Sequence, residues 1–220
     1  MTTGLNRTRE IVRILRFDRV QIVTHWLNAA FFAVLVATAI PLYFGSFFGI
    51  VLERHVVQLV HLWTGLAWPL PIIVSMLGPW GTRMRRDLRR VSFWTRGEIE
   101  WIKSFGQSPL KADKFNPGQK LNTLFVASTL PVLLVSGSML QWFRFFSVPL
   151  RVGATFVHDT FALGLVVVVV GHIMMALTHR EMLQSMFTGT VSETWAKTYA
   201  ADWFEECSSA LDDADETQEI

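Results

Sequence analysis

The sequence predicts an all-α membrane protein built as a bundle of four transmembrane helices. Of its 220 residues, 51% are hydrophobic. Four apolar runs each reach the roughly 20 residues that a helix needs to cross a hydrocarbon core of about 30 Å. Because that core offers the backbone no hydrogen-bond partners, such runs form helices. The expected helices cover residues 22–43, 57–77, 121–143 and 154–177, which contain no Lys, Arg or Glu and only one Asp, Asp159.

The residues that precede each run support its assignment as a membrane helix. The first, 22–43, is longer than the apolar part of a signal peptide and follows about twenty mostly polar residues, so we expect a retained helix. The runs 57–77 and 154–177 each follow a short connection. The run 121–143 follows a segment with Asn, Pro and Gly, a composition typical of a turn that starts a helix.

Positive charge is distributed unevenly between the two ends of this bundle. Arginine and lysine crowd the N-terminal segment and the connection between the second and third runs, whereas the other two connections carry only Arg54, Arg144 and Arg151. By the positive-inside rule, both termini and the middle connection are cytoplasmic, in a bacterial inner membrane. We assign the basic connection to topology and to contact with anionic lipid, and we see no reason to invoke nucleic acid.

Four histidines lie within the apolar runs. His25, His61 and His158 each occur a few residues inside the start of a run, and His172 lies fourteen residues beyond His158 on the same run. On a helix this spacing is about 21 Å, and the two side chains point within roughly 40° of each other. Ionisable groups in membrane segments rarely face lipid, and imidazole is an axial ligand of haem iron. The pattern predicts two haems b, with these histidines binding the haem iron.

Depth in the membrane pairs the histidines. The first run starts in the cytoplasm and the second and fourth start outside, so His25 and His172 lie near the inner face and His61 and His158 near the outer face. We therefore expect an outer haem on His61 and His158 and an inner haem on His25 and His172. Two six-coordinate haems at opposite depths would carry electrons across the membrane.

Other readings of the histidines stay open. Any one of them can be a hydrogen-bonded packing residue, and a haem-free transporter or structural anchor could use them to bind substrate or metal. His55 and His179 lie beside charged residues at the ends of runs, and we interpret both as interfacial. Cys207 is the only cysteine, which excludes Cys-ligated iron–sulfur clusters and covalently attached haem. Electrons must then come from another subunit or a small carrier.

The segment 114–120 leads directly into the third run at the cytoplasmic face. Its amide and ammonium groups could donate hydrogen bonds to a quinone carbonyl, with Asn116, Gly118 and Gln119 as the candidate binding residues. The alternative is a turn that starts a helix, with Asn116 as its N-cap.

Several segments together suggest a family. The most specific are the Asn-x-Gly-Gln-Lys segment and the stretch from Gly189 to Trp203, and the others are Phe17-Asp18-Arg19, His25-Trp26, His61 with Gly65, Ser136-Gly137, His158 and residues 171–176. Over roughly residues 10–206 the chain resembles the γ (cytochrome b) subunit of respiratory formate dehydrogenases, within the wider cytochrome b561-like membrane subunits. In the first run, Thr38-Ala39 stands where that family usually has Ser-Gly.

The resemblance implies partners and a direction of electron flow. It implies an outward-facing iron–sulfur subunit and a molybdenum- or tungsten-containing catalytic subunit that oxidises formate, with a quinone reduced at the cytoplasmic side. His25, His61, His158 and His172 match the family's haem ligands, and Asn116, Gly118 and Gln119 match its quinone segment. The chain would be the electron-transfer and quinone-reducing subunit of this oxidoreductase complex. The alternative is the cytochrome b subunit of a hydrogenase, or of a quinol-oxidising reductase such as thiosulfate reductase.

We expect one domain and a tail. Residues 1–206 form the dihaem membrane domain, including a cytoplasmic C-terminal extension. Residues 207–220 are acidic with few apolar side chains, and we expect a tail that is disordered or contacts a partner.

Overall fold

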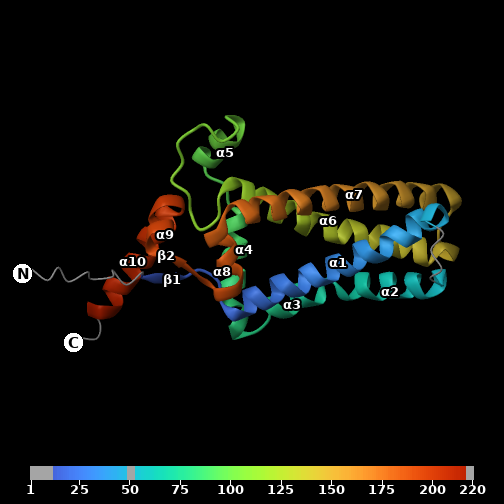
Figure 1. The fold of residues 1–220 in the computed structure, drawn as a ribbon, viewed down its shortest axis with the longest axis horizontal. Helices are drawn as coiled ribbons and strands as arrows, with labels where there is room; N and C mark the ends of the chain where they lie inside the picture. The colour runs from blue at the N-terminus through green and yellow to red at the C-terminus, as the bar shows by residue number, and fades with distance from the viewer. Residues whose placement is uncertain (1–11, 49–52, 217–220) are drawn as a thin grey trace, which may run out of the picture.

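The computed structural model describes residues 12–48 and 53–216. Long helices lie side by side in a bundle, with smaller elements gathered at one end (Figure 1). The described chain has four helical segments long and apolar enough to cross a membrane, so the predicted all-α membrane fold is confirmed. They are formed by α1 (Arg19–Phe48), α2 (Arg54–Ala67) with α3 (Leu70–Met76), α6 (Pro117–Gln141) and α7 (Val148–Thr178). Helix α1 packs mainly on α2, and α6 mainly on α7.

The second span is interrupted, although the sequence predicted one helix over 57–77. Helix α2 ends at Ala67 and α3 begins at Leu70. Pro69 and Pro71 have no N–H to donate to the carbonyls of Gly65 and Ala67, and their rings crowd the preceding turn. Two missing hydrogen bonds within three residues therefore break the helix without ending the span.

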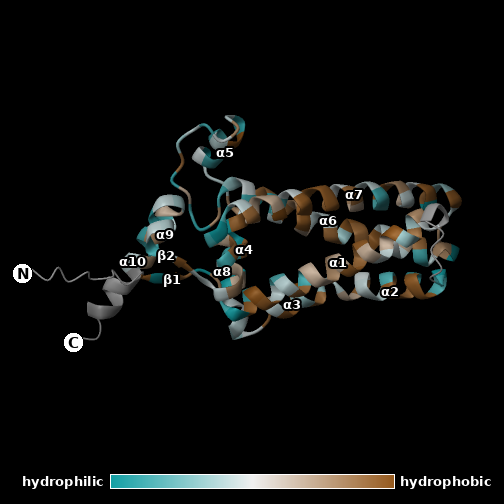
Figure 2. Cartoon of the chain, in the orientation of Figure 1, coloured by the Kyte–Doolittle hydropathy of each residue, from teal (hydrophilic) through white to brown (hydrophobic). Residues whose placement is uncertain are grey.

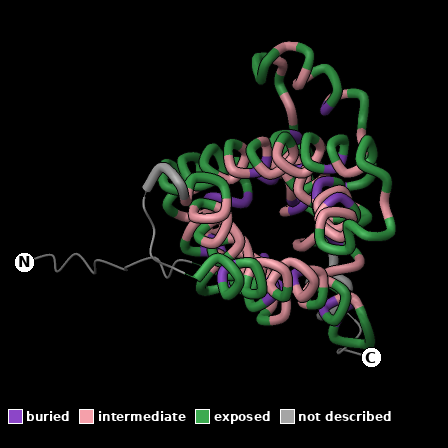
Figure 3. Tube along the Cα trace, turned by 90° about the vertical axis from the view of Figure 1, so that its right-hand side faces the viewer, coloured by how far each residue is buried: buried purple, intermediate pink, exposed green. Residues whose placement is uncertain are grey.

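The surface of the bundle suits a lipid environment. Hydrophobic residues predominate along the helices, and hydrophilic residues gather at the end that carries the smaller elements (Figure 2). Apolar side chains on the spans point outward, with Phe156 72% and Leu163 67% exposed. A view along the bundle places exposed residues on the outer side of the helices (Figure 3). In water such a surface would be unfavourable, whereas in hydrocarbon it matches its surroundings.

The smaller elements form a cap over one end of the bundle (Figure 1). The cap comprises β1 (Arg13–Leu15), η1 (Pro79–Gly81), α4 (Thr82–Ser92), α5 (Arg96–Lys103), α8 (Arg180–Thr188), β2 (Thr190–Ser192), α9 (Glu193–Tyr199) and α10 (Ala201–Glu216). The opposite end carries η2 (Phe143–Phe145), between α6 and α7. The segments next to both chain ends and the middle connection thus lie at the same end, as the charge pattern predicted.

A two-stranded sheet within the cap was not predicted. Strands β1 and β2 pair antiparallel, with Ile14 opposite Val191. Each strand has three residues, too short for an alternation of polar and apolar residues to be recognised. The sheet joins the segment before the first span to the segment after the last one.

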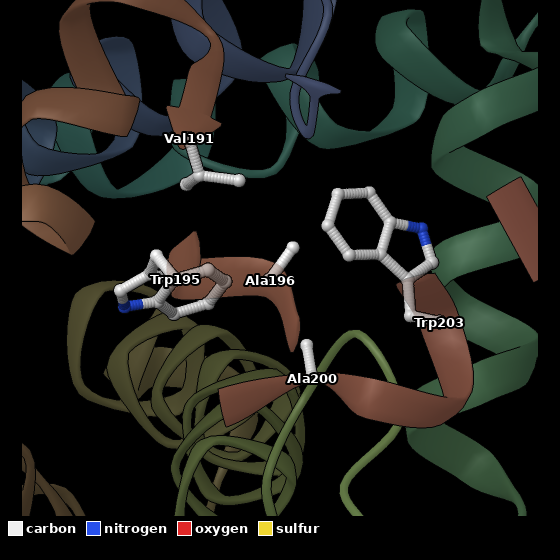
Figure 4. Close-up of a cluster of buried hydrophobic side chains, with 5 residues drawn as sticks. All are labelled: Val191, Trp195, Ala196, Ala200 and Trp203. Carbon is white, nitrogen blue, oxygen red and sulfur yellow. The ribbon is translucent and has the colours of Figure 1, made fainter. Parts of the chain in front are cut away.

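An apolar cluster forms the core of the cap. Its members are Val191, Trp195, Ala196, Ala200 and Trp203, all buried (Figure 4). Phe204 and Cys207 of α10 pack against this cluster. Helix α10 continues to Glu216.

Several basic residues next to the cap are buried, two of them in ion pairs, and do not form a solvated or lipid-facing surface. Lys114 pairs with Asp87, which also accepts a 2.5 Å hydrogen bond from Gln21 Nε2. Lys120 pairs with Glu98 at 2.6 Å. Arg16 is only 2% exposed and its Nη2 donates to the Lys114 carbonyl at 2.9 Å. Burial lowers the pKa of Arg16 to about 10, although Asp87 opposes the shift, and burial also lowers the pKa of Lys114.

Candidate functional site

The four histidines come from three helices and meet in two pairs. His25 lies on α1, His61 on α2, and His158 and His172 on α7. The ring centres of His25 and His172 are 6.3 Å apart, and those of His61 and His158 are 6.5 Å apart. The first pair lies toward the capped end of the bundle and the second toward the opposite end, because α7 starts at the uncapped end and carries both His158 and His172.

The separation of each pair fits a metal ion held between two imidazoles. An imidazole nitrogen binds a transition metal at about 2 Å and lies about 1 Å from its own ring centre, so two opposed rings sharing one metal have centres roughly 6 Å apart. The observed 6.3 and 6.5 Å match this spacing. Both distances are too long for a direct hydrogen bond between ring nitrogens.

The donor set indicates which kind of metal centre fits. Among the described residues, no group of three or more His, Cys, Asp or Glu side chains gathers as a metal site. A bare zinc ion needs about three or four protein ligands. A haem iron needs only the two axial ones, because its macrocycle supplies the other four. Pairs of opposed histidines between apolar helices therefore fit haem better than a bare ion.

Two hydroxyl groups that were not selected as site residues from the sequence lie against one histidine pair. Thr38 Oγ1 on α1 is 2.8 Å from His61 Nδ1, and Ser136 Oγ on α6 is 3.1 Å from His158 Nδ1. An added Cβ at Gly137 would lie 3.1 Å from His158 Cε1, so glycine gives this ring its room. In the sequence, Ser136 and Thr38 stood out only as parts of the family resemblance, and a hydroxyl on a facing helix at the depth of a histidine is the further signal that could have indicated these contacts.

The two remaining histidines of the described chain lie apart from these pairs. His55 is exposed near the start of α2. His179 is exposed at the end of α7, where its Nδ1 lies 2.9 Å from Thr178 Oγ1 and 2.9 Å from the Met175 carbonyl. Both positions agree with interfacial roles.

The proposed quinone residues start helix α6. Asn116 Oδ1 accepts from the Gln119 backbone N–H at 2.9 Å, and Gln119 Oε1 accepts from the Asn116 N–H at 3.0 Å. This reciprocal capping box occupies one oxygen of each side chain. The amide nitrogens remain as donors, that of Gln119 lying 3.8 Å from Met182 Sδ on α8. An added Cβ at Gly118 would lie 3.3 Å from Asn116 Oδ1, so glycine suits the cap.

Comparison with known proteins identifies the family. Residues 16–189 match the family model of prokaryotic cytochrome b561. The chain belongs to this family. The matched stretch contains all four paired histidines and the start of α6, and it ends just before β2. Because a prokaryotic cytochrome b561 is a cytochrome b, the cofactor that membership implies is haem b.

Curated relatives of this prokaryotic cytochrome b561 agree with the resemblance seen in its motifs. The formate dehydrogenase cytochrome b556 subunit of Haemophilus influenzae is 26% identical over 202 residues, covering 88% of this chain and 83% of the relative. The formate dehydrogenase cytochrome b556(fdo) subunit of Escherichia coli is 24% identical over 205 residues, covering 88% and 92%. The nitrate-inducible cytochrome b556(Fdn) subunit of the same organism is 23% identical over 218 residues, covering 94% and 95%. The predicted resemblance is confirmed.

Proposed function

We propose that this prokaryotic cytochrome b561 is a dihaem electron-transfer subunit, with His61 and His158 holding an outer haem b and His25 and His172 an inner one. The observation that carries the proposal is the spacing of the two ring pairs, 6.3 and 6.5 Å, at two depths of an apolar bundle. When bound, haem iron supplies one-electron redox chemistry. Histidines on both sides of each centre leave no open coordination position, which favours electron transfer over ligand binding.

The bundle sets the distance that electrons would cross. His158 and His172 lie on one uninterrupted helix, about 21 Å apart along its axis. A rigid helix bearing one ligand of each centre holds the two centres at a constant separation.

Quinone would bind at the capped end, on the amide donors of Asn116 and Gln119 beside Gly118. These residues begin α6, and Gln119 reaches α8, which follows directly after the span that carries His172. Trp26, the neighbour of His25, donates from its Nε1 to the Met186 carbonyl of the same α8 at 2.8 Å. Helix α8 thus connects the proposed quinone residues to the inner histidine pair. Its place at the end of the spans would give quinone access to protons from the cytoplasm.

The relatives guide the choice of partners. Since the three relatives above are formate dehydrogenase subunits, we assign the chain to such a complex in a bacterial inner membrane, with both termini cytoplasmic. An iron–sulfur subunit would deliver electrons at the outer end, and a molybdenum- or tungsten-containing subunit would oxidise formate. Electrons taken outside and protons taken inside would transfer charge across the membrane.

Spectroscopy on the purified protein tests the haem assignment. After dithionite reduction, two bis-histidine haems b should give sharp α bands and a haem-to-protein ratio of two. Replacing either His61 or His158 with alanine should remove the outer haem and leave the inner one at least partly assembled. His25→Ala and His172→Ala should do the opposite. Loss of the same haem in His25→Ala and His61→Ala would refute the pairing, and protein without haem would refute the function.

A further inference from the structure

The two hydroxyl groups beside the outer histidine pair occupy equivalent positions in the bundle. Thr38 on α1 reaches a histidine of α2, and Ser136 on α6 reaches a histidine of α7. Since α1 packs mainly on α2 and α6 mainly on α7, each hydroxyl and its histidine belong to one helix pair. The separations along the sequence are nearly the same, 23 and 22 residues. Two independent helix pairs thus provide the same contact to the same type of side chain.

The contacts within each helix favour one direction for each hydrogen bond. Thr38 Oγ1 lies 2.8 Å from the Val34 carbonyl and 3.0 Å from the Leu35 carbonyl, both of which can only accept. With its single proton donated to one of these carbonyls, the hydroxyl oxygen can accept from His61 Nδ1–H, and the Leu35 carbonyl is a further hydrogen-bond partner of the same ring. Ser136 Oγ is likewise 2.7 Å from the Val132 carbonyl, and with its proton donated there its oxygen can accept from His158 Nδ1–H.

Each contact leaves the opposite ring nitrogen ready to bind a metal. With the proton on Nδ1, the lone pair is on Nε2, the tautomer that haem ligation at Nε2 requires. Ser136 is only 3% exposed, and in such an apolar setting a hydrogen bond is stronger than in water. The hydroxyls thus select both the tautomer and the orientation of the rings.

The inner pair differs. Within the described part of the chain, the ring nitrogens of His25 and His172 make no side-chain or backbone hydrogen bond. The aromatic neighbour of His25 is Trp26, whose ring meets it edge-on with centres 5.4 Å apart. The two pairs therefore have similar ring spacing and different hydrogen bonding.

We propose that Thr38 and Ser136 are positioning residues for the ligands of the outer haem, and that their hydrogen bonds lower the midpoint potential of this haem relative to the inner one. The inference rests on the proposed haem ligation. A hydrogen bond from Nδ1–H makes the imidazole a stronger donor, which stabilises the higher charge on its metal. An outer centre of lower potential makes electron transfer toward the inner centre favourable, so the asymmetry sets the direction from the outer end to the capped end.

Removing the hydroxyls one at a time tests this inference. Thr38→Val and Ser136→Ala keep the side-chain volume nearly constant. Matched controls are Thr155→Val and Ser128→Ala, whose hydroxyls also donate within their own helices, to the carbonyls of residues 151 and 125 at 3.0 Å, and make no hydrogen bond to a histidine of the described residues. Each variant is purified with its haems, reconstituted in lipid nanodiscs and followed by potentiometric titration of the α bands, with low-temperature EPR of the low-spin signals.

The expected result is a change in one haem only. In Thr38→Val and in Ser136→Ala, the midpoint potential of the outer haem, identified as the haem that is lost in His61→Ala, rises by up to about 59 mV. This shift corresponds to a tenfold change in the one-electron reduction equilibrium. The other haem and both control variants stay unchanged, and Thr38→Ser restores the wild-type potential. If Thr38→Val assembles poorly, the potential of the outer haem in Ser136→Ala, which is the smaller change, decides whether the inference holds.

Other outcomes overturn the inference in distinguishable ways. Unchanged potentials in both variants with both haems present, or equal shifts of both haems, would overturn it and leave the dihaem function standing. A wild-type protein without two bis-histidine haems would instead overturn the proposed function, and this is seen before any variant is made.

Discussion

The two possible roles of Asn116, helix cap and quinone ligand, can be separated because they use different atoms of its side chain. The cap uses Oδ1, which accepts from the Gln119 N–H at 2.9 Å. Quinone binding would use the amide nitrogen. Asn116→Ala removes both groups, whereas Asn116→Ser keeps a capping oxygen and lacks the nitrogen donor. Gln119→Glu similarly keeps the oxygen that accepts from the Asn116 N–H and removes the donor.

The expected magnitudes follow from these contacts. Loss of the cap in Asn116→Ala should lower the free energy of unfolding by about 1 kcal/mol, and Asn116→Ser should leave it nearly unchanged. Loss of one hydrogen bond of about 1 kcal/mol to quinone should weaken binding roughly fivefold in both variants. Both haem spectra should remain intact, because neither variant changes the histidines.

Stopped-flow reoxidation of the reduced haems by a soluble quinone analogue measures the change in quinone binding. Thermal unfolding in detergent measures how much the helix cap at Asn116 contributes to stability. Slow reoxidation in Asn116→Ser with normal stability would establish the quinone contact. Wild-type reoxidation in both Asn116→Ser and Gln119→Glu, with a slow rate only in Asn116→Ala, would refute it and leave the segment as a helix cap.

Three further predictions concern topology and packing. A reporter inserted near Gln107 should be cytoplasmic and one near Val148 external, as an accessibility assay in whole cells would reveal; the reverse result would place the proposed quinone segment on the wrong face. Asp87→Asn should destabilise the fold by about 3 kcal/mol in thermal unfolding, because Lys114 would be left buried without its partner, and adding Lys114→Met should recover most of the loss. Gly137→Ala should lower the occupancy of the outer haem in pyridine haemochrome assays and leave the inner one unchanged, since the new methyl group would crowd a histidine ring at 3.1 Å.

The spans and the gathering of histidines could be predicted because both depend on local patterns. A run of about 20 apolar residues spans a bilayer whatever its neighbours are, and helical rise converts sequence position into depth. Charge then orients the runs, so that residues far apart in sequence, such as His25 and His172, can be assigned to the same depth. The sequence also contains the signal for the break at Pro69, because a proline interrupts a helix. The prediction missed it because the apolar run continues past this proline and was taken as one helix.

The cap could not be predicted in the same way. Its sheet depends on Ile14 lying opposite Val191, a pairing between segments at opposite ends of the chain. Its buried ion pairs depend on distant partners too, as with Lys114 and Asp87. From composition alone, a cluster of arginine and lysine indicates topology, and only the three-dimensional arrangement reveals which of these charges are neutralised inside the protein.

The hydroxyl groups at the outer pair illustrate why a candidate site is harder to predict than its ligands. A Ser or Thr within a helix ordinarily donates to a carbonyl three or four residues earlier, and this local bond gives no hint of a second contact. Ser136 and Thr38 both make that bond and still have a lone pair to offer. On the resemblance described above, Thr38 stands where serine is expected, and it keeps the hydroxyl that contacts His61. The apparent departure from the pattern therefore preserves its chemistry, because the oxygen that the histidine needs is common to both side chains.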